Sequence, residues 1–335
     1  MPGEHSAITD VPGISVGHCT GTDAGTTVVL AASTTGQGVA GGVTQRGGAP
    51  GTRETDLLKS EKAVGTAHAV VLSGGSAYGL AASDGVMTCQ ESQGIGLPVA
   101  NGAIVPSAIL FDPGRCAPFT FRPDASFGAA ACQAANDGPV AMGNIGAGAG
   151  ARSGGTKGGI GTASALLPNG VVVGAIVAVN SASQTFNGTT GDFFANYILS
   201  PGDTTIAARP PATAQGPLPA LPTELPDELL RATTIAVVAT NVRLTKAQAN
   251  KVAQMADDGM ARAIRVAHGT GDGDTVFALA TGTSTVAPNI NQIGGAAADA
   301  LSRAIVRALL AAEALAFPGC NVASYCSRFP SRCTQ

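Results

Sequence analysis

The chain has 335 residues, of which 44% are apolar and only 12% charged, with 46 glycines and no tryptophan. This length accommodates one large domain or two ordinary ones, and the composition favours a tightly packed interior of small side chains. The net charge of -3 offers no electrostatic basis for nucleic-acid binding, and no run reaches the roughly 18 apolar residues that span a membrane. The N-terminal residues lack the features of a signal peptide, so we expect a soluble cytoplasmic protein.

Of the seven cysteines, Cys19, Cys89, Cys116 and Cys132 are scattered and form no CxxC pair, which argues against a zinc site and favours reduced, buried thiols. The other three, Cys320, Cys326 and Cys333, stand in a tail beyond the last expected helix. This atypical tail, residues 318–335, is interpreted as a disordered extension in preference to a disulfide or metal knot.

Residues 7–43 alternate short apolar runs with turns, which is typical of strands and hairpins. His18 and Cys19 follow the first run, but neighbours on an extended chain point to opposite faces, so both are interpreted as structural. Segment 46–56 is a glycine-rich loop whose two arginines either bind an anion or pair with the acidic residues of the same loop. We prefer the pairing.

A strand over residues 67–72 leads through a serine- and glycine-containing turn into a helix over 77–91. Such a turn presents backbone donors and a helix N-terminus to whatever lies in front of it. Tyr78, in the first helical turn, is placed to aim its hydroxyl the same way, although such a tyrosine is more often packed in the core. His68, inside the strand, is interpreted as a core histidine.

Residues 146–159 nearly match a dinucleotide fingerprint, but they are too rich in glycine to form the helix on which a pyrophosphate sits. We therefore expect no nucleotide cofactor. Lys157 in this loop is either a mobile surface cation or a charge delivered to a site. Two strands follow over 162–180, and Asn180 ends the second, where its amide either caps a turn or donates into a site.

Residues 201–231 contain seven of the 20 prolines, which predicts an exposed, extended linker that tolerates a break at its end. An apolar, β-branched run then begins at Thr233 and predicts a buried strand. If the bond after Ala232 breaks, Thr233 gains an α-amino group beside its hydroxyl, and this amine can act as the general base. The alternative is that Thr233 merely opens an ordinary strand.

A capping-box pattern predicts a helix over 245–265, and a second helix over 296–316 closes the fold. Between them, Asp272 and Asp274 lie on a turn before a strand. Two carboxylates at this spacing either approach Thr233 together or belong to a hairpin turn or a calcium loop. Taken by themselves, they favour the turn.

Five stretches carry recognisable motifs in order along the chain: 46–56, 74–80, 158–164, 233–240 and 272–278. Together they resemble the L-aminopeptidase/D-esterase family, which includes the β-aminopeptidases, the DmpA enzyme and the NylC nylon-oligomer hydrolases. The resemblance covers about residues 8 to 316. It implies an α+β fold, specifically a four-layer α/β/β/α sandwich, formed by one catalytic domain. It also implies a homotetramer and a precursor that cuts itself into residues 1–232 and 233–335.

The resemblance also implies roles for individual residues. Thr233 matches the family's nucleophile, Asn180 the asparagine of the oxyanion hole, and Tyr78 the site tyrosine. Asp272 and Asp274 match the pair that supports the nucleophile, in the form found in the nylon-oligomer enzymes.

Three positions fit the family pattern less simply. Lys157 or Gly155 matches the catalytic lysine, depending on how the glycine-rich loop is aligned. Ala232 precedes the nucleophile where members usually carry Asn or Gly, although the ornithine acetyltransferases, which share this kind of fold, look similar at an Ala-Thr cleavage point. The tail beyond residue 318 has no counterpart.

These observations lead to one hypothesis, a self-processing amide hydrolase with an N-terminal threonine nucleophile and no metal or other cofactor. Its substrates would be small amino-acyl amides, peptides or esters, as in an aminopeptidase, a β-aminopeptidase or a 6-aminohexanoate-oligomer hydrolase. We expect no nucleic-acid or membrane partner. Two alternatives stay open: an acyltransferase that uses the same acyl-enzyme, and an uncleaved, non-catalytic homologue.

Overall fold

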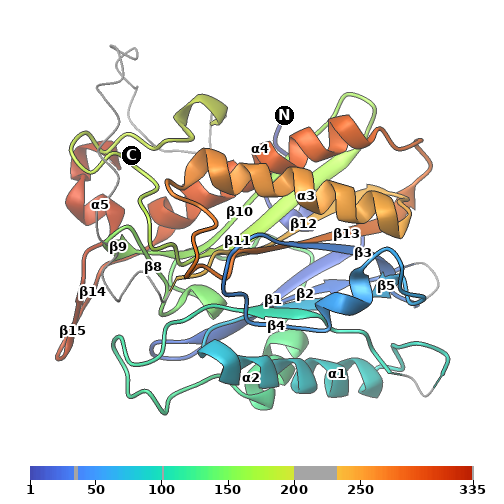
Figure 1. Cartoon of the computed structure of the whole chain (residues 1–335), viewed down its shortest axis with the longest axis horizontal. Coiled ribbons are helices and arrows are strands. Elements are labelled where there is room, and N and C mark those ends of the chain that lie inside the picture. The colour runs from blue at the N-terminus through green and yellow to red at the C-terminus, as the bar shows by residue number, and fades with distance from the viewer. Residues whose placement is uncertain (34–36, 100–101, 200–231, 334–335) are drawn as a thin grey trace.

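The computed structural model describes residues 1–33, 37–99, 102–199 and 232–333. Two sheets lie face to face between two layers of helices, with α1 and α2 on one outer side and α3 and α4 on the other (Figure 1). The α/β/β/α sandwich expected from the resemblance is confirmed. The linker predicted over 201–231 lies outside the described residues.

The first sheet has five strands in the order β1-β2-β6-β7-β4. Its pairs are antiparallel except for β6 and β7, which run parallel. Helices α1 and α2 cover its outer face and bury apolar side chains of both helices against β2 and β6. The bounds are β1 (Ile14–Thr20), β2 (Gly25–Ala31), β4 (Thr52–Arg53), β6 (Ala69–Ser73), β7 (Ser107–Ile109), α1 (Ala82–Ser92) and α2 (Ala125–Gln133).

The second sheet has six strands in the order β10-β11-β12-β13-β3-β5. Its two central strands, β12 and β13, are parallel, and helix α3 connects them. The bounds are β3 (Val39–Gln45), β5 (Thr66–Ala67), β10 (Gly159–Leu166), β11 (Val172–Val179), β12 (Ile235–Val242), β13 (Thr275–Ser284), α3 (Lys246–Ala263) and α4 (Ile290–Ala311). Two short hairpins pair β8 (Arg152–Ser153) with β9 (Thr156–Lys157), and β14 (Leu315–Phe317) with β15 (Cys320–Val322).

Strand β12 is apolar on both faces because both are covered. Ile235 and Val237 face the first sheet and belong to the core between the sheets, whereas Ala236 and Val238 pack under the helices. Small residues allow the layers to approach closely: a Cβ at Gly161 would lie 2.0 Å from the carbonyl oxygen of Ala304 in α4. This packing explains the low charge and the high glycine content.

Most elements expected from the sequence are present, with shifted ends. The expected helix over 77–91 begins as a 3-10 helix, Ser76–Ala81, and continues as α1. The capping box that opens α3 is confirmed, with Thr245 accepting from the amide of Gln248. Helix α4 begins earlier than expected because Asn289 caps it. Further short helices are Ile8–Asp10, Thr55–Leu58, Gly146–Gly148, Asn196–Ile198, α5 (Tyr325–Arg328) and Pro330–Arg332.

The described residues of the tail are folded onto the domain, so its interpretation as a disordered extension is wrong. Tyr325 of α5 is 1% exposed, and its ring lies 4.3 Å from that of Phe193 and 5.1 Å from that of Phe186, measured between centroids. Its hydroxyl donates to the carbonyl of Gly191 at 2.6 Å. Aromatic burial therefore anchors the tail to the domain.

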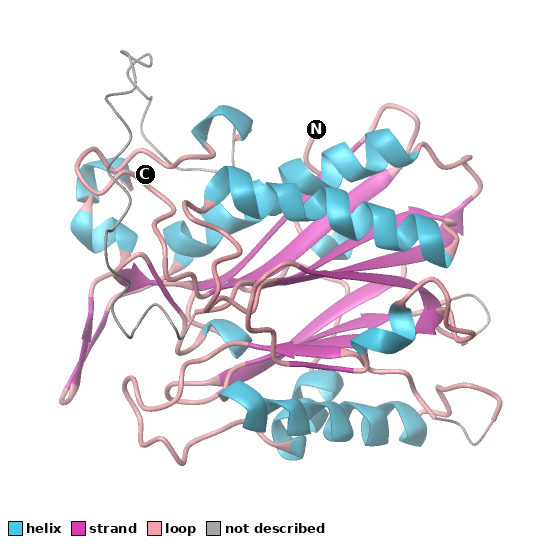
Figure 2. Cartoon of the chain, viewed as in Figure 1, coloured by secondary structure: helices cyan, strands magenta, loops and turns pink. Residues whose placement is uncertain are grey.

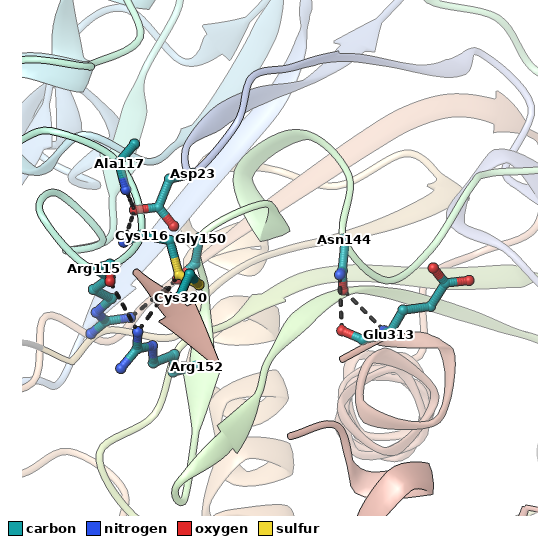
Figure 3. The surroundings of a disulfide bond; sticks show 9 residues. All are labelled: Asp23, Arg115, Cys116, Ala117, Asn144, Gly150, Arg152, Glu313 and Cys320. Carbon is teal, nitrogen blue, oxygen red and sulfur yellow. Dashed lines mark hydrogen bonds between the residues drawn. A yellow bond between two sulfur atoms is a disulfide. The ribbon is translucent and has the colours of Figure 1, made fainter. Parts of the chain in front are cut away.

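The interpretation of the scattered cysteines as reduced thiols is also wrong for three of the four, Cys89, Cys116 and Cys132. The disulfides are Cys89–Cys132, Cys116–Cys320 and Cys326–Cys333, and Cys19 is free. Figure 3 shows the second of these, where the loop after β7 meets the β14–β15 hairpin. Cys116 and Cys320 are 204 residues apart and meet only in the folded chain, so spacing did not reveal this pair.

Most helices lie on the outside of the sandwich and the strands within it (Figure 2). Within the part of the chain that the structure describes, no helix is both long enough and apolar enough to cross a bilayer.

Candidate active site

Thr233 lies two residues before β12 and is buried. The residue is 6% exposed, and its backbone amide donates to the carbonyl of Asn180 at 2.8 Å. Its Oγ1 donates to the carbonyl oxygen of Ala232 at 2.5 Å. The hydroxyl is therefore in contact with the carbonyl of the peptide bond that joins residues 232 and 233.

The backbone amide of Gly273 faces the same two atoms. It lies 3.1 Å from Thr233 Oγ1 and 3.2 Å from the carbonyl oxygen of Ala232. An amide at this position can donate to the oxygen that becomes negative when the carbonyl is attacked. Residue 273 must be glycine for this approach, because a Cβ would lie 2.7 Å from Thr233 Oγ1 and 2.9 Å from the carbonyl oxygen of Ala49.

Asp274 binds the chain next to the threonine. Its Oδ1 accepts the amide of Thr234 at 2.8 Å, and its Oδ2 accepts the amide of His268 at 3.0 Å. The ring Nδ1 of His268 also lies 3.0 Å from that Oδ2. With both oxygens occupied by donors, Asp274 is suited to holding the backbone that carries Thr233.

Asp272 has a different environment. The backbone of Asp272 forms a parallel bridge with that of Ala232, and its Oδ2 accepts the amide of Gly269 at 2.8 Å. Burial, together with the neighbouring charge of Asp274, raises the pKa of the Asp272 carboxyl to about 6. The Asp272 carboxyl therefore gains or loses its proton at a pH close to neutral.

Asn180 reaches Thr233 through its backbone. Its side-chain Nδ2 donates to the carbonyl of Phe111 at 3.2 Å, and its Oδ1 accepts the backbone amide of Arg152 at 3.0 Å. The guanidinium of Arg115 also donates to that Oδ1. The side chain is thus fixed between three partners, two of which, Arg115 and Arg152, lie beside the Cys116–Cys320 disulfide shown in Figure 3.

Lys157 lies in the interior, which excludes its interpretation as a mobile surface cation. Its Nζ donates to the carbonyls of Gly148 at 2.7 Å and Gly158 at 2.9 Å. Burial lowers the pKa of this amine to about 7, against the opposing charges of Asp112 and Asp23. An amine in this state is neutral or charged with nearly equal ease at neutral pH.

Tyr78 is 56% exposed, and the guanidinium of Arg122 lies 3.6 Å from the centroid of its ring. It is therefore not the packed core aromatic that its sequence context alone favours. The structure thus brings Thr233, Asp272, Asp274 and the backbone of Asn180 together, whereas Lys157 bonds to its own glycine-rich loop and Tyr78 stacks with Arg122.

One residue near the site was missed by the sequence analysis. His268 lies between two buried carboxylates, Asp274 at 3.0 Å from Nδ1 and Asp257 of α3 at 3.1 Å from Nε2. Arg46 also pairs with Asp257, at 3.5 Å, and not with the acidic residues of its own loop. The one available signal was that a histidine stands four and six residues before two aspartates in a glycine-rich segment.

Comparison with known proteins decides the family. The model of peptidase family S58 matches residues 6–322. The chain belongs to peptidase family S58. The match confirms the resemblance drawn from the five motifs, and peptidases of this kind hydrolyse amide bonds, so the chain is an amide hydrolase.

Relatives of this S58 peptidase include proteins named for related activities. An uncharacterized aminopeptidase of Mycobacterium leprae is 43% identical, over 98% of this chain and 96% of that protein. A 6-aminohexanoate-oligomer endohydrolase of Kocuria sp. is 30% identical, over 81% of this chain and 74% of that protein.

Solved structures share the fold of this S58 peptidase. A β-aminopeptidase of Burkholderia sp. superposes with a TM-score of 0.71 at 23% identity, covering 99% of this chain and 94% of that one. The L-aminopeptidase D-Ala-esterase/amidase of Ochrobactrum anthropi, described as a variant of the Ntn-hydrolase fold, gives a TM-score of 0.72 at 20% identity, covering 99% and 96%.

Proposed function

We propose that this S58 peptidase cuts its own chain between Ala232 and Thr233 and then uses the freed Thr233 as its nucleophile. The observation that carries the proposal is the contact of Thr233 Oγ1 with the Ala232 carbonyl, 2.5 Å from its oxygen, while the amide of Gly273 faces both atoms. A nucleophile, an electrophile and an oxyanion donor are thus adjacent in the uncut chain.

Self-cleavage proceeds by an N-to-O acyl shift. The Oγ1 of Thr233 bonds to the carbonyl carbon of Ala232, and the Gly273 amide donates to the resulting oxyanion. The bond from that carbon to the Thr233 nitrogen then breaks, and the hydroxyl proton ends on the nitrogen. Water hydrolyses the ester, which leaves a carboxylate on Ala232 and a free amine on Thr233.

In the mature enzyme the same Oγ1 attacks a substrate amide or ester. The α-amine of Thr233 takes the hydroxyl proton and passes it to the leaving group, since such amines titrate near pH 7.7–8.0. Asp274 keeps the strand start in place through the amide of Thr234. Asp272, whose carboxyl pKa is raised to about 6, holds the ammonium form of Thr233 or of the substrate.

We assign the other site residues supporting roles in the reaction. Gly273 serves the oxyanion of self-cleavage, and Asn180 serves that of substrate turnover once its Nδ2 leaves the carbonyl of Phe111. Lys157 stabilises the loop that binds Asn180, and Tyr78 contacts substrate from the exposed side.

The names of the relatives support a class of substrates. Aminopeptidase and 6-aminohexanoate-oligomer endohydrolase share the cleavage of an amide, and we propose small amino-acyl amides, peptides or esters for this enzyme. We further propose that it works as a homotetramer.

Intact mass of the purified protein tests the proposal, measured after reduction of disulfides. On incubation, wild type should give fragments of residues 1–232 and 233–335, Thr233→Ala should stay whole, and Thr233→Ser should still be cut. The mature protein is then screened against aminoacyl anilides, β-peptides and 6-aminohexanoate oligomers, with and without an added amine acceptor. A full-length mass for wild type after long incubation would refute self-processing, and transfer to the amine would indicate an acyltransferase.

A further inference from the structure

His268 makes three polar contacts with two carboxylates. Its backbone amide and its Nδ1 both lie 3.0 Å from Asp274 Oδ2, and its Nε2 lies 3.1 Å from Asp257 Oδ2. The backbone of His268 has a φ of 61°, a conformation that L-residues rarely adopt. That conformation allows the amide and the ring of one residue to meet the same oxygen.

The ring lies among groups of opposite charge. The side chains of Asp257 and Asp274 are 1% and 4% exposed, and that of His268 is 16% exposed. Burial alone would lower the pKa of the imidazole, but its interactions with the Asp257 and Asp274 carboxylates outweigh burial and raise the pKa to about 9. His268 is therefore a cation at neutral pH, and it compensates two carboxylates that have left water.

A continuous chain of hydrogen bonds runs from this cation toward the proposed nucleophile. His268 holds Asp274 Oδ2, Asp274 Oδ1 accepts the amide of Thr234 at 2.8 Å, and Thr234 follows Thr233 directly. At its other end, Asp257 ties the ring to helix α3. The arrangement links a rigid helix to the start of β12.

We propose that His268 is a positioning residue, which fixes the Asp274 carboxylate on the amide of Thr234 and so holds Thr233 in place for its reaction. The inference rests on the proposed role of Thr233. It assigns no chemical step to His268, whose ring bonds to Asp257 and Asp274 and acts on Thr233 only through the second of these.

A second effect is electrostatic. The cation of His268 lowers the pKa of the Asp272 carboxyl, against the larger effects of burial and Asp274. The charged groups that face the ring are Asp257 from α3, Asp272 and Asp274 from the turn before β13, and, through Asp257, Arg46 from the segment after β3. Removing the imidazolium should therefore move the ionisation of Asp272 to higher pH.

Two substitutions of His268 by amide side chains test the contacts of its two ring nitrogens separately. In His268→Asn the side-chain nitrogen can stand where Nδ1 stood and still donate to Asp274, whereas in His268→Gln it reaches the position of Nε2 and donates to Asp257. We expect self-cleavage to slow by less than about tenfold in the first variant and by about 100-fold in the second, because small displacements of a reacting group have effects of this size. In both, the limb of substrate hydrolysis that the Asp272 carboxyl sets in the matured protein should shift to higher pH, and His5→Gln serves as the control histidine.

Hydrogen exchange in uncleaved protein tests the role of His268 independently of self-cleavage. In a Thr233→Ala background, hydrogen exchange of the Thr234 amide should accelerate by about tenfold or more in His268→Gln and less in His268→Asn. Unchanged exchange, or equal slowing of cleavage in both variants with an unmoved acidic limb of substrate hydrolysis, would overturn the positioning role. If wild type is never cut, the proposed function fails, and the exchange experiment still decides the role of His268.

Discussion

Cys116 and Cys320 form a disulfide across 204 residues of sequence, joining the loop after β7 to the β14–β15 hairpin. The two cysteines lie on opposite sides of the proposed cut between residues 232 and 233. The other disulfides, Cys89–Cys132 and Cys326–Cys333, each lie within one of the two pieces.

Self-cleavage should therefore leave the two pieces covalently joined. Without reductant, the mature protein should have the mass of the full chain plus one water, and reductant should release two chains. Cys116→Ser should give two chains without reductant, whereas Cys326→Ser should not, because its disulfide lies within the small piece. Release of both chains from unreduced wild type would show that the 116–320 disulfide is not formed.

Gly273→Ala should slow self-cleavage by about 100-fold or more. The added methyl group would stand 2.7 Å from Thr233 Oγ1, so the hydroxyl or the Gly273 amide must move. Gly295→Ala in α4 is the matched control, since no atom lies within 4 Å of its Cβ position, and it should raise the free energy of unfolding by up to about 1 kcal/mol. Mass spectrometry over time gives both rates; equal rates would mean that the Gly273 contacts are not used.

The rate of substrate hydrolysis should fall in two steps as the pH drops: first below about pH 7.7–8.0, where the Thr233 amine takes up a proton, and again through about 6, where the Asp272 carboxyl becomes protonated and loses its negative charge. Asp272→Asn should be slow at every pH and should lack the second step. A pH profile of kcat/KM on an aminoacyl anilide distinguishes the two. An unchanged second step in the variant would assign it to another group.

The uncut protein should lose stability in alkali, because the stabilisation that protonated His268 provides is lost there. The pKa of this histidine is about 9 in the folded chain and about 6.5 when unfolded, so the folded state holds the proton more tightly. The stabilisation is complete below pH 6.5 and is lost as the pH rises through 9, by up to roughly 3 kcal/mol. Denaturant unfolding of Thr233→Ala with and without His268→Gln measures this, and parallel pH dependences would contradict it.

Sequence patterns predicted the local structure well wherever the signal was local. The capping box of Thr245 and Gln248 opens α3 as expected, and the apolar run after Thr233 forms β12 because a sheet and a helix layer cover its two faces. The arrangement of four layers followed from ordered motifs and not from periodicity. Periodicity alone does not specify which strands become neighbours.

Contacts between distant segments could not be predicted in this way. His268 meets Asp257 because a turn folds back on helix α3, and no spacing in the sequence encodes that return. The amide of Gly273 acts through its backbone, which every residue except proline has, so residue type carried no signal. Asn180 was identified as a site position, but the three partners of its side chain come from other segments.

The position of β12 and β13 has a consequence for how the mature protein survives denaturation. The piece after residue 232 supplies both of these central strands, which lie between β10–β11 and β3–β5 of the other piece. Before the cut, refolding is a unimolecular event. After the cut it stays unimolecular while the Cys116–Cys320 disulfide joins the two pieces, but once that disulfide is reduced two chains must find each other, and recovery depends on concentration. Under reducing conditions, the survival of the mature protein should therefore be set by how slowly it unfolds.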